Sequence, residues 1–356
     1  MTQTFTPSLS TPPDSICLLR LSALGDISHI LPTLRTLQTH WPQTKITWVI
    51  GKAEYQLVKE ISNVEFILFD KSAGMKAYLA LRKTMRQKQF DVLLHMQLSL
   101  RASMVSIFIP AKIKLGFDKD RAKDLQSFFC KQQIHPLSTR QHVVDSFLEF
   151  PRHFGLSPVL RWDLPVNQHA LNNIKKRIHS DKPLLVINAC ALAKSKNWRN
   201  WTVEGYAQVA DYAQRQLGMQ VILSGGNNPL ESDIANQICQ QCSQPPQNFV
   251  ASTSLEEMIA LLHHATVVIA PDTGPVHIAS SLGTNTIGLY ATTNPLRAGP
   301  YNYQQYVVNK YPEALQQYNQ TDVDHAPWGT RVKTAEAMAL ITVDDVIEQL
   351  ERIMID

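Results

Sequence analysis

Three consecutive residues, Asp272-Thr273-Gly274, have the types and the setting of a phosphate-binding turn. They follow a β-branched run, Val267 to Ala270, that predicts a strand buried on both faces. Pro275 suits the first position of a following helix, whose first N–H groups have no partner inside the helix. Because the helix dipole also favours negative charge there, we expect an anion site, with phosphate as the anion. The alternative is that Asp272 or Thr273 only caps the helix.

A second candidate, Asp26, follows the first predicted strand, Ile16 to Leu21. The segment Arg20-Leu-Ser-Ala-Leu-Gly-Asp26 indicates a strand end, a glycine-containing turn and a helix start. It is not G-x-G-x-x-G, so the usual dinucleotide fingerprint is missing. A carboxylate at the end of a strand could accept a proton from a substrate hydroxyl. The alternative role for Asp26 is a helix cap.

The elements that must position these residues form two α/β halves. We predict strands at 16–21, 45–50, 66–69 and 92–96, and helices at 28–39, 52–61, 75–88 and 143–154. The pattern restarts with strands at 184–188, 221–224, 267–270 and 286–290, and helices at 203–217, 230–241, 254–264 and 343–353. This alternation predicts two doubly wound parallel sheets facing across a cleft. Ligands should lie at the carboxyl ends of their strands.

The length of 356 residues also favours two domains. We place the first at 1–165 and the second at 166–335, because the segment 155–183 contains prolines and has little periodicity in its first part. A C-terminal helical segment, 336–356, follows. Met1 to Pro13 is polar and proline-rich, which predicts a disordered leader and not a signal peptide.

Composition indicates a soluble globular protein, with 44% hydrophobic and 18% charged residues. The net charge of +4 is too small and too scattered to indicate nucleic-acid binding. No apolar run approaches the length of a membrane span. Five scattered cysteines suit a reducing compartment, and the single C-x-x-C at Cys239 and Cys242 has no second pair to complete a zinc site. We therefore expect a cytoplasmic protein, free or bound peripherally to a membrane.

The two polar motifs, in this order, resemble those of glycosyltransferase family 9, the heptosyltransferases of the lipopolysaccharide inner core. The matching segments are Arg20 to Asp26, Asp272-Thr-Gly-Pro-Val-His277 and Gly288-Leu-Tyr-Ala-Thr-Thr-Asn-Pro295, and the chain is most similar to the heptosyltransferase I type. The resemblance implies a GT-B fold of two Rossmann-like domains, with the C-terminal helix packing back on the first. It also implies inverting, metal-independent transfer of heptose from ADP-heptose to a Kdo residue of lipid A.

For the donor side, the resemblance assigns individual residues. Asp26 matches the family's base by its position in the motif. Lys196 stands two residues before a tryptophan, as the family's phosphate-binding lysine does, and Lys194 is the rival. Glu231 fits the carboxylate that holds the donor ribose, with an acidic residue in a first helical turn as the alternative. His277 could hydrogen-bond the donor phosphate or sugar, or only brace the loop.

For the acceptor side, the candidates are Gln97, Arg101, His142 and Lys71. Gln97 and Arg101 follow the strand at 92–96, and His142 precedes a helix in a stretch that resembles the family. Lys71 and Lys76 could meet the anionic groups of Kdo or lipid A. An exposed, solvated side chain is the alternative for each.

We expect a monomer that meets the inner-membrane surface peripherally, binds no nucleic acid and uses no cofactor beyond its ADP-sugar substrate. Within the family, another nucleotide sugar or a later core acceptor is the alternative. Two other classes are an NAD-dependent oxidoreductase or epimerase, against which the missing fingerprint argues, and a non-catalytic nucleotide-binding protein.

Overall fold

The computed structural model describes residues 11–135, 137–138, 140–178, 181–191 and 197–355. The chain divides into two compact units, Met1–Pro165 and Val166–Asp356. The division falls at Pro165, inside the proline-containing segment 155–183. Most of the expected leader, residues 1–10, lies outside the described residues.

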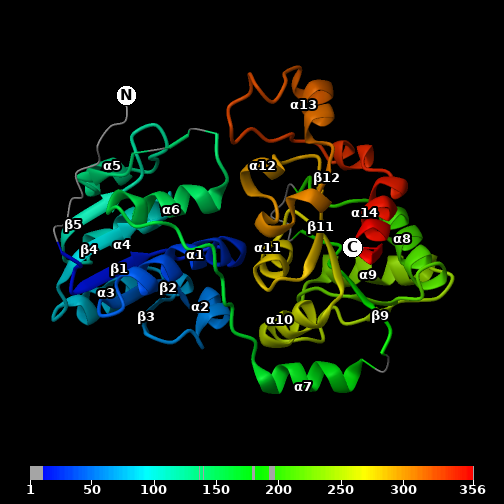
Figure 1. Ribbon diagram of the computed structural model, residues 1–356, viewed down its shortest axis with the longest axis horizontal. Helices are drawn as coiled ribbons and strands as arrows, with labels where there is room; N and C mark the ends of the chain where they lie inside the picture. The colour runs from blue at the N-terminus through cyan, green and yellow to red at the C-terminus, as the bar shows by residue number, and fades with distance from the viewer. Residues whose placement is uncertain (1–10, 136, 139, 179–180, 192–196, 356) are drawn as a thin grey trace. The chain divides into compact units, whose positions relative to one another are not determined.

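The first unit contains a parallel sheet of six strands in the order β3-β2-β1-β4-β5-β6 (Figure 1). The strands are β1 (Ser15–Leu19), β2 (Lys45–Gly51), β3 (Val64–Phe69), β4 (Phe90–His95), β5 (Ala111–Gly116) and β6 (Gln132–Gln133). Its α-helices are α1 (Leu24–His40), α2 (Lys52–Val58), α3 (Met75–Met85), α4 (Leu100–Ile107), α5 (Gln126–Phe129) and α6 (Val143–His153).

Successive side chains of β1 point to opposite faces of the sheet, so their contacts show which helices cover each face. Cys17 and Leu19 share one core cluster with Leu81 of α3 and Val105 of α4. Arg20, of the opposite parity, lies over the ring of Phe147 in α6, and α6 packs against α1. Helices α3 and α4 therefore cover one face, and α1 and α6 the other.

The second unit repeats the design with a six-stranded parallel sheet in the order β12-β11-β10-β7-β8-β9. The strands are β7 (Leu184–Ile187), β8 (Gln220–Leu223), β9 (Gln247–Asn248), β10 (Val267–Pro271), β11 (Asn285–Tyr290) and β12 (Val308–Asn309). Its α-helices are α7 (Gln168–Arg177), α8 (Val203–Arg215), α9 (Pro229–Gln241), α10 (Leu255–His264), α11 (Gly274–Ser281), α12 (Pro295–Ala298), α13 (Tyr311–Asn319) and α14 (Val343–Ile355).

Each sheet has the Rossmann strand order, in which the chain starts in the middle and winds outward in both directions. The point where the direction reverses lies between β1 and β4 in the first unit, and between β7 and β10 in the second. Ligands of doubly wound sheets bind at the carboxyl ends of the strands at this point. Asp26 and Gln97 follow β1 and β4, and Asp272 follows β10 directly.

The predicted strands and helices are present, with boundaries that differ by a few residues. No element was predicted between Gln97 and Val143, where the structure has α4, β5, α5 and β6. Helix α4 was missed because its outward face carries Leu100, Met104 and Ile107, which hides the polar–apolar period. None of the helices in the described part of the chain is long and apolar enough to cross a bilayer.

The C-terminal helix packs in the core of the second unit, and the expectation that it also packs back on the first domain stays a prediction. Its principal contacts are with α8, β11 and β12, so α14 belongs to the second unit. Val346, Leu350 and Ile353 form its buried stripe in the core of that unit. Thr342 and Asp345 cap each other's N–H groups at its start. The amphipathic period predicted the helix, but a period does not specify which surface the apolar stripe meets.

We predict that Leu350→Ala destabilises the second unit by about 2–4 kcal/mol, because it leaves a cavity in a closed core. Leu350 is fully buried, whereas Ile355 in the same helix is 86% exposed. Ile355→Ala is therefore the matched control, with an expected change of less than about 0.5 kcal/mol. Urea unfolding followed by tryptophan fluorescence measures both. Equal effects of the two substitutions would contradict the packing described for α14.

Candidate functional site

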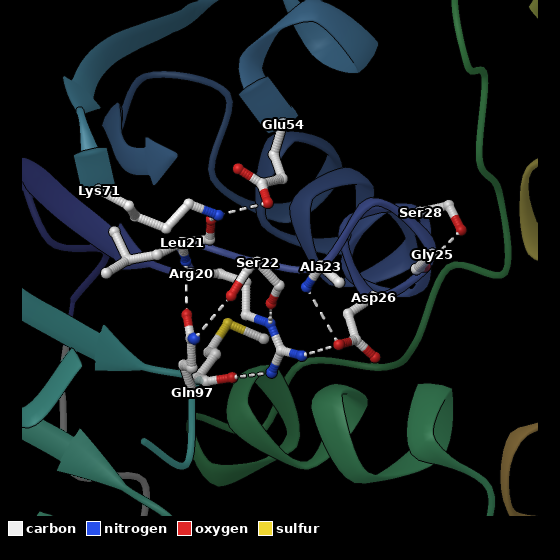
Figure 2. A network of polar contacts seen from close by, with 11 residues as sticks. Arg20, Leu21, Ser22, Ala23, Gly25, Asp26, Ser28, Glu54, Lys71 and Gln97 are labelled. Atoms are coloured by element: carbon white, nitrogen blue, oxygen red, sulfur yellow. Dashed lines mark hydrogen bonds and ion pairs between the residues drawn. The ribbon is translucent and has the colours of Figure 1, made fainter. Parts of the chain in front are cut away.

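The first polar site is built around the loop between β1 and α1. Figure 2 shows the side chains of Arg20, Gln97 and Lys71 reaching this loop from three strand ends. The guanidinium of Arg20 pairs with Asp26 at 2.6 Å and donates to the carbonyls of Ser22 and Met96, each at 2.7 Å. Arg20, at the end of β1, thus contacts the loop, the end of β4 and the carboxylate of Asp26 at the same time.

Asp26 lies in the first turn of α1 and has the helix-closing role considered for it, together with an ion pair to Arg20. Its Oδ2 accepts the Ala23 N–H at 3.2 Å, so it does help to close the start of the helix. The same oxygen pairs with Arg20. The side chain of Asp26 is 39% exposed, whereas that of Arg20 is 11% exposed. The carboxylate is therefore held from the protein side and remains accessible to solvent.

Gln97 is an internal partner of this loop. Its Oε1 accepts the Leu21 N–H at 2.6 Å, and its Nε2 donates to Ser22 Oγ at 3.1 Å. The residue is buried. These contacts join the carboxyl ends of β1 and β4 at the point where the strand order reverses.

Lys71 is also held inside the unit. Its ammonium pairs with Glu54 at 2.5 Å and donates to the Leu21 carbonyl at 3.3 Å. The site is crowded, because a Cβ added to Gly51 would lie 2.2 Å from Glu54 Oε2 and 2.3 Å from the Leu21 carbonyl. Through these contacts Lys71 stabilises the backbone at the end of β1. It is therefore not the exposed, solvated cation that the sequence analysis gave as its alternative role.

The two remaining acceptor candidates lie in different settings. Arg101 is exposed in the first turn of α4, whose N-cap Ser99 accepts the Ala102 N–H at 3.3 Å. His142 is buried and is the N-cap of α6, where its Nδ1 accepts the Val144 N–H at 3.1 Å. Its ring also meets His29 edge to face, with centroids 5.6 Å apart. Of the two, Arg101 is the one that is open to a ligand.

The second polar site surrounds the turn after β10. Thr273 is the N-cap residue of α11, but its side chain makes no capping hydrogen bond. Its Oγ1 is buried and has no hydrogen-bond partner among the described residues. Pro275 is the second residue of α11, one position later than expected but still in the first turn. Simple side-chain capping by Thr273 is therefore wrong, and the start of α11 keeps unpaired polar groups of the kind that bind anions.

Asp272 is the anchor of this turn. Its carboxylate lies 3.4 Å from His277 Nε2 and 3.9 Å from Arg199, and Arg199 also donates to its carbonyl at 2.7 Å. Burial alone would raise the pKa of Asp272, but the hydrogen bond and charge of His277 and the charge of Arg199 outweigh it, so the pKa lies below its usual value. His277, from the same helix, thus braces the turn.

Glu231 lies in the first turn of α9, next to the end of β8. Its Oε2 accepts the Gly226 N–H at 2.6 Å, and a Cβ on Gly225 would approach that oxygen to 2.6 Å. Burial raises the pKa of Glu231, and the hydrogen bond from Gly226 offsets this only in part. Oε1 is buried without a hydrogen-bond partner among the described residues. A carboxylate in this state has spare acceptor capacity for a ligand hydroxyl.

Lys194 and Lys196 lie outside the described residues. The sequence patterns did not indicate Arg20 as the partner of Asp26, Glu54 as the partner of Lys71, or Arg199 beside Asp272. Arg199 follows the two lysines within five residues, so the cationic segment was recognised but its third member was not. Within the part of the chain that the structure describes, no three His, Cys, Asp or Glu residues gather as a metal cluster would require.

Two Rossmann-like units in one chain are the architecture of the GT-B fold. Solved structures share this fold. A family 9 glycosyltransferase from Veillonella parvula aligns with a TM-score of 0.78 over 96% of this chain and 97% of that one, at 20% identity. The Escherichia coli heptosyltransferase WaaC with ADP aligns with a TM-score of 0.70 over 95% and 99%, also at 20% identity.

Sequence comparison gives the family. The model described as "Glycosyltransferase family 9 (heptosyltransferase)" matches residues 78–326. The lipopolysaccharide core heptosyltransferase OpsX of Haemophilus influenzae is 37% identical over 98% of this chain and 99% of its own length. Lipopolysaccharide heptosyltransferase 1 of E. coli K12 is 24% identical over 84% and 95%. The chain therefore belongs to glycosyltransferase family 9.

The contacts of Lys71 predict a stability effect. Lys71→Met leaves the carboxylate of Glu54, which is 8% exposed, without its cation, so we expect a loss of about 1–3 kcal/mol in the free energy of unfolding. Adding Glu54→Gln should restore most of this loss. Chemical denaturation of the single and double variants is the measurement.

The matched control is Lys52→Met. Lys52 pairs with Asp70 at 3.4 Å, but the two side chains are 67% and 37% exposed, so the expected loss is below about 1 kcal/mol. If Lys71→Met and Lys52→Met were equally mild, Lys71 would be a surface cation after all.

Proposed function

We propose that this chain is an inverting glycosyltransferase of lipopolysaccharide inner-core biosynthesis. It moves heptose from ADP-L-glycero-D-manno-heptose to a Kdo residue of lipid A. Membership of the heptosyltransferase family supports the transferred sugar, and WaaC, a protein of the same fold solved with ADP, supports the nucleotide. The observation that carries the chemistry is the accessible carboxylate of Asp26, held by Arg20 at the end of β1.

Asp26 is the general base in this proposal. Inversion needs one displacement at the anomeric carbon, and the attacking hydroxyl loses its proton as the new bond forms. One oxygen of Asp26 is engaged by Arg20 and by the Ala23 N–H. The other oxygen is then the one that accepts the proton, and Arg20 acts by keeping the carboxylate in one orientation.

The leaving ADP develops negative charge on its β-phosphate as the bond to heptose breaks. The first N–H groups of α11 and the ammonium of Lys196 stabilise that charge, and Lys194 is the alternative cation. Arg199 and His277 hold the Asp272 turn at the start of this helix. The reaction then needs no metal ion, because the protein supplies the positive charge.

Glu231 binds the donor ribose through its free oxygen, since a carboxylate accepts hydrogen bonds from vicinal hydroxyls. On the acceptor side, Arg101 is the candidate open to the anionic groups of Kdo. Three other candidates support the acceptor site indirectly. Gln97 and Lys71 hydrogen-bond the backbone of Leu21 in the β1–α1 loop, and His142 caps the start of α6. We also propose that the protein works as a monomer at the cytoplasmic face of the inner membrane.

Purified chain, ADP-heptose and Kdo-lipid A test the proposal, with mass spectrometry of the product. We expect the product to gain one heptose, and the rate to persist in excess EDTA. Transfer only to an acceptor that already carries heptose would move the enzyme to a later core position. Strict dependence on added Mg²⁺ or Mn²⁺ would refute the proposed stabilisation of the leaving group by the protein alone.

We predict that Asp26→Asn lowers the transfer rate by about 10²-fold or more, the usual scale of general-base catalysis. Asparagine keeps the size and can still accept the Ala23 N–H, so the affinity for ADP should change little, whereas the loss of the charge that pairs with Arg20 should lower the stability of the first unit. Steady-state kinetics and calorimetry with ADP measure the two quantities. Near-normal turnover would leave Asp26 with its helix-closing role alone.

A further inference from the structure

The outward surface of α3 and α4 carries large apolar side chains that the fold leaves in water. Met75 and Leu79 of α3 and Leu100, Met104 and Ile107 of α4 have exposed fractions from 40% for Met104 to 72% for Met75. On α4 these positions recur at helical spacing, while Ala102 and Val105 fill the core side. Both faces of this helix are therefore apolar, which its packing in the unit does not require.

The two helices form one surface. Both pack on the same face of the sheet, where Leu81 of α3 and Val105 of α4 join one core cluster. Tyr78 and Phe108 join the helices directly, with ring centroids 6.1 Å apart. Their outward sides therefore point the same way, and we name this surface the α3–α4 face.

Cations accompany these apolar side chains. Lys76, Arg82, Lys83 and Arg86 are exposed on or just after α3, and no ion pair described for the chain uses them. No Asp or Glu occurs from residue 71 to 90, or from 92 to 117. The α3–α4 face is thus a strongly basic surface with apolar side chains among its charges.

The asymmetry extends to the whole unit. Residues 1–165 contain 21 Lys and Arg against 13 Asp and Glu, a formal charge of +8. Residues 166–356 contain 13 against 17, a charge of −4, and the two values give the +4 of the chain. The small net charge of the whole chain is therefore the sum of a basic first unit and an acidic second unit.

We infer that the α3–α4 face docks on an anionic lipid bilayer, with its cations at the headgroups and its apolar side chains in the interface. A surface that combines cations with large apolar residues matches that environment, in which both kinds of side chain contribute to binding. A second copy of the chain is a poor occupant, because two such faces would bring like charges together. The inference deepens the proposed function, which supplies a membrane lipid as acceptor, but lipid binding can be measured without catalysis.

The test is co-sedimentation of the full chain with phosphatidylcholine vesicles, with and without phosphatidylglycerol. We expect binding to the anionic vesicles that weakens as salt rises, and little binding to the neutral ones. Neutralising three cations with Arg82→Gln, Lys83→Gln and Arg86→Gln should weaken binding by about 10²-fold, at roughly fivefold for each charge. Met104→Ser with Ile107→Ser should weaken it by roughly tenfold.

Leu160→Ser and Ile355→Ser are the matched controls, since both side chains are exposed outside the α3–α4 face. They should bind vesicles as the parent does. Thermal melting confirms that each variant is folded. Transfer to a water-soluble Kdo acceptor should survive in the charge and apolar variants, because no residue assigned to the site is changed.

The outcomes separate this inference from the proposed function. Vesicle binding without transfer to any acceptor would refute the proposed function and leave the docking face standing. Equal binding by the triple variant and the parent, or no binding to anionic vesicles, would refute the docking face. If the chain formed a concentration-dependent dimer that the same substitutions abolished, the α3–α4 face would be an interface between two copies of the chain and not a membrane-binding surface.

Discussion

The ion pair between Arg20 and Asp26 is the interaction on which the first site depends. Arg20 is almost fully buried, so its charge must be satisfied within the fold, and it is satisfied by one carboxylate, two carbonyls and the ring of Phe147. Leaving such a charge unpaired would cost several kcal/mol. The same contacts that stabilise Arg20 therefore set the path of the β1–α1 loop and orient the carboxylate proposed as base.

Both units hold a carboxylate in place at the end of a central strand, but they use different residues to do so. Each places a carboxylate after a central strand and fixes it with cationic or imidazole side chains, Arg20 in one case and Arg199 with His277 in the other. In the first unit the carboxylate stays accessible, which suits a base. In the second, Asp272 is enclosed and its pKa is lowered, which suits a permanent anion that holds a turn. Burial and partners, and not residue type, separate the two roles.

Much of this was predictable from the sequence. Strand and helix periods, the glycine-containing turns and the order of the motifs indicated both Rossmann-like units and the positions of Asp26 and Asp272. Side-chain partners were not predictable, because they join residues far apart in the chain: Lys71 was expected at the surface and lies against Glu54, and Gln97 was expected to contact ligand and holds Leu21. Helix α4 was missed because its exposed face is apolar, which breaks the pattern on which the prediction rests.

A double-mutant cycle on the rate of a single turnover tests the central claim most directly. The variants are Arg20→Met, Asp26→Asn and the two combined, each checked for folding and for ADP affinity. If Arg20 acts by orienting the carboxylate of Asp26, its loss has nothing further to remove once the base is gone, and the double variant should be about as slow as Asp26→Asn alone. If the two losses of rate multiplied in full, Arg20 and Asp26 would act independently, which would contradict the role of Arg20 as the residue that orients the base.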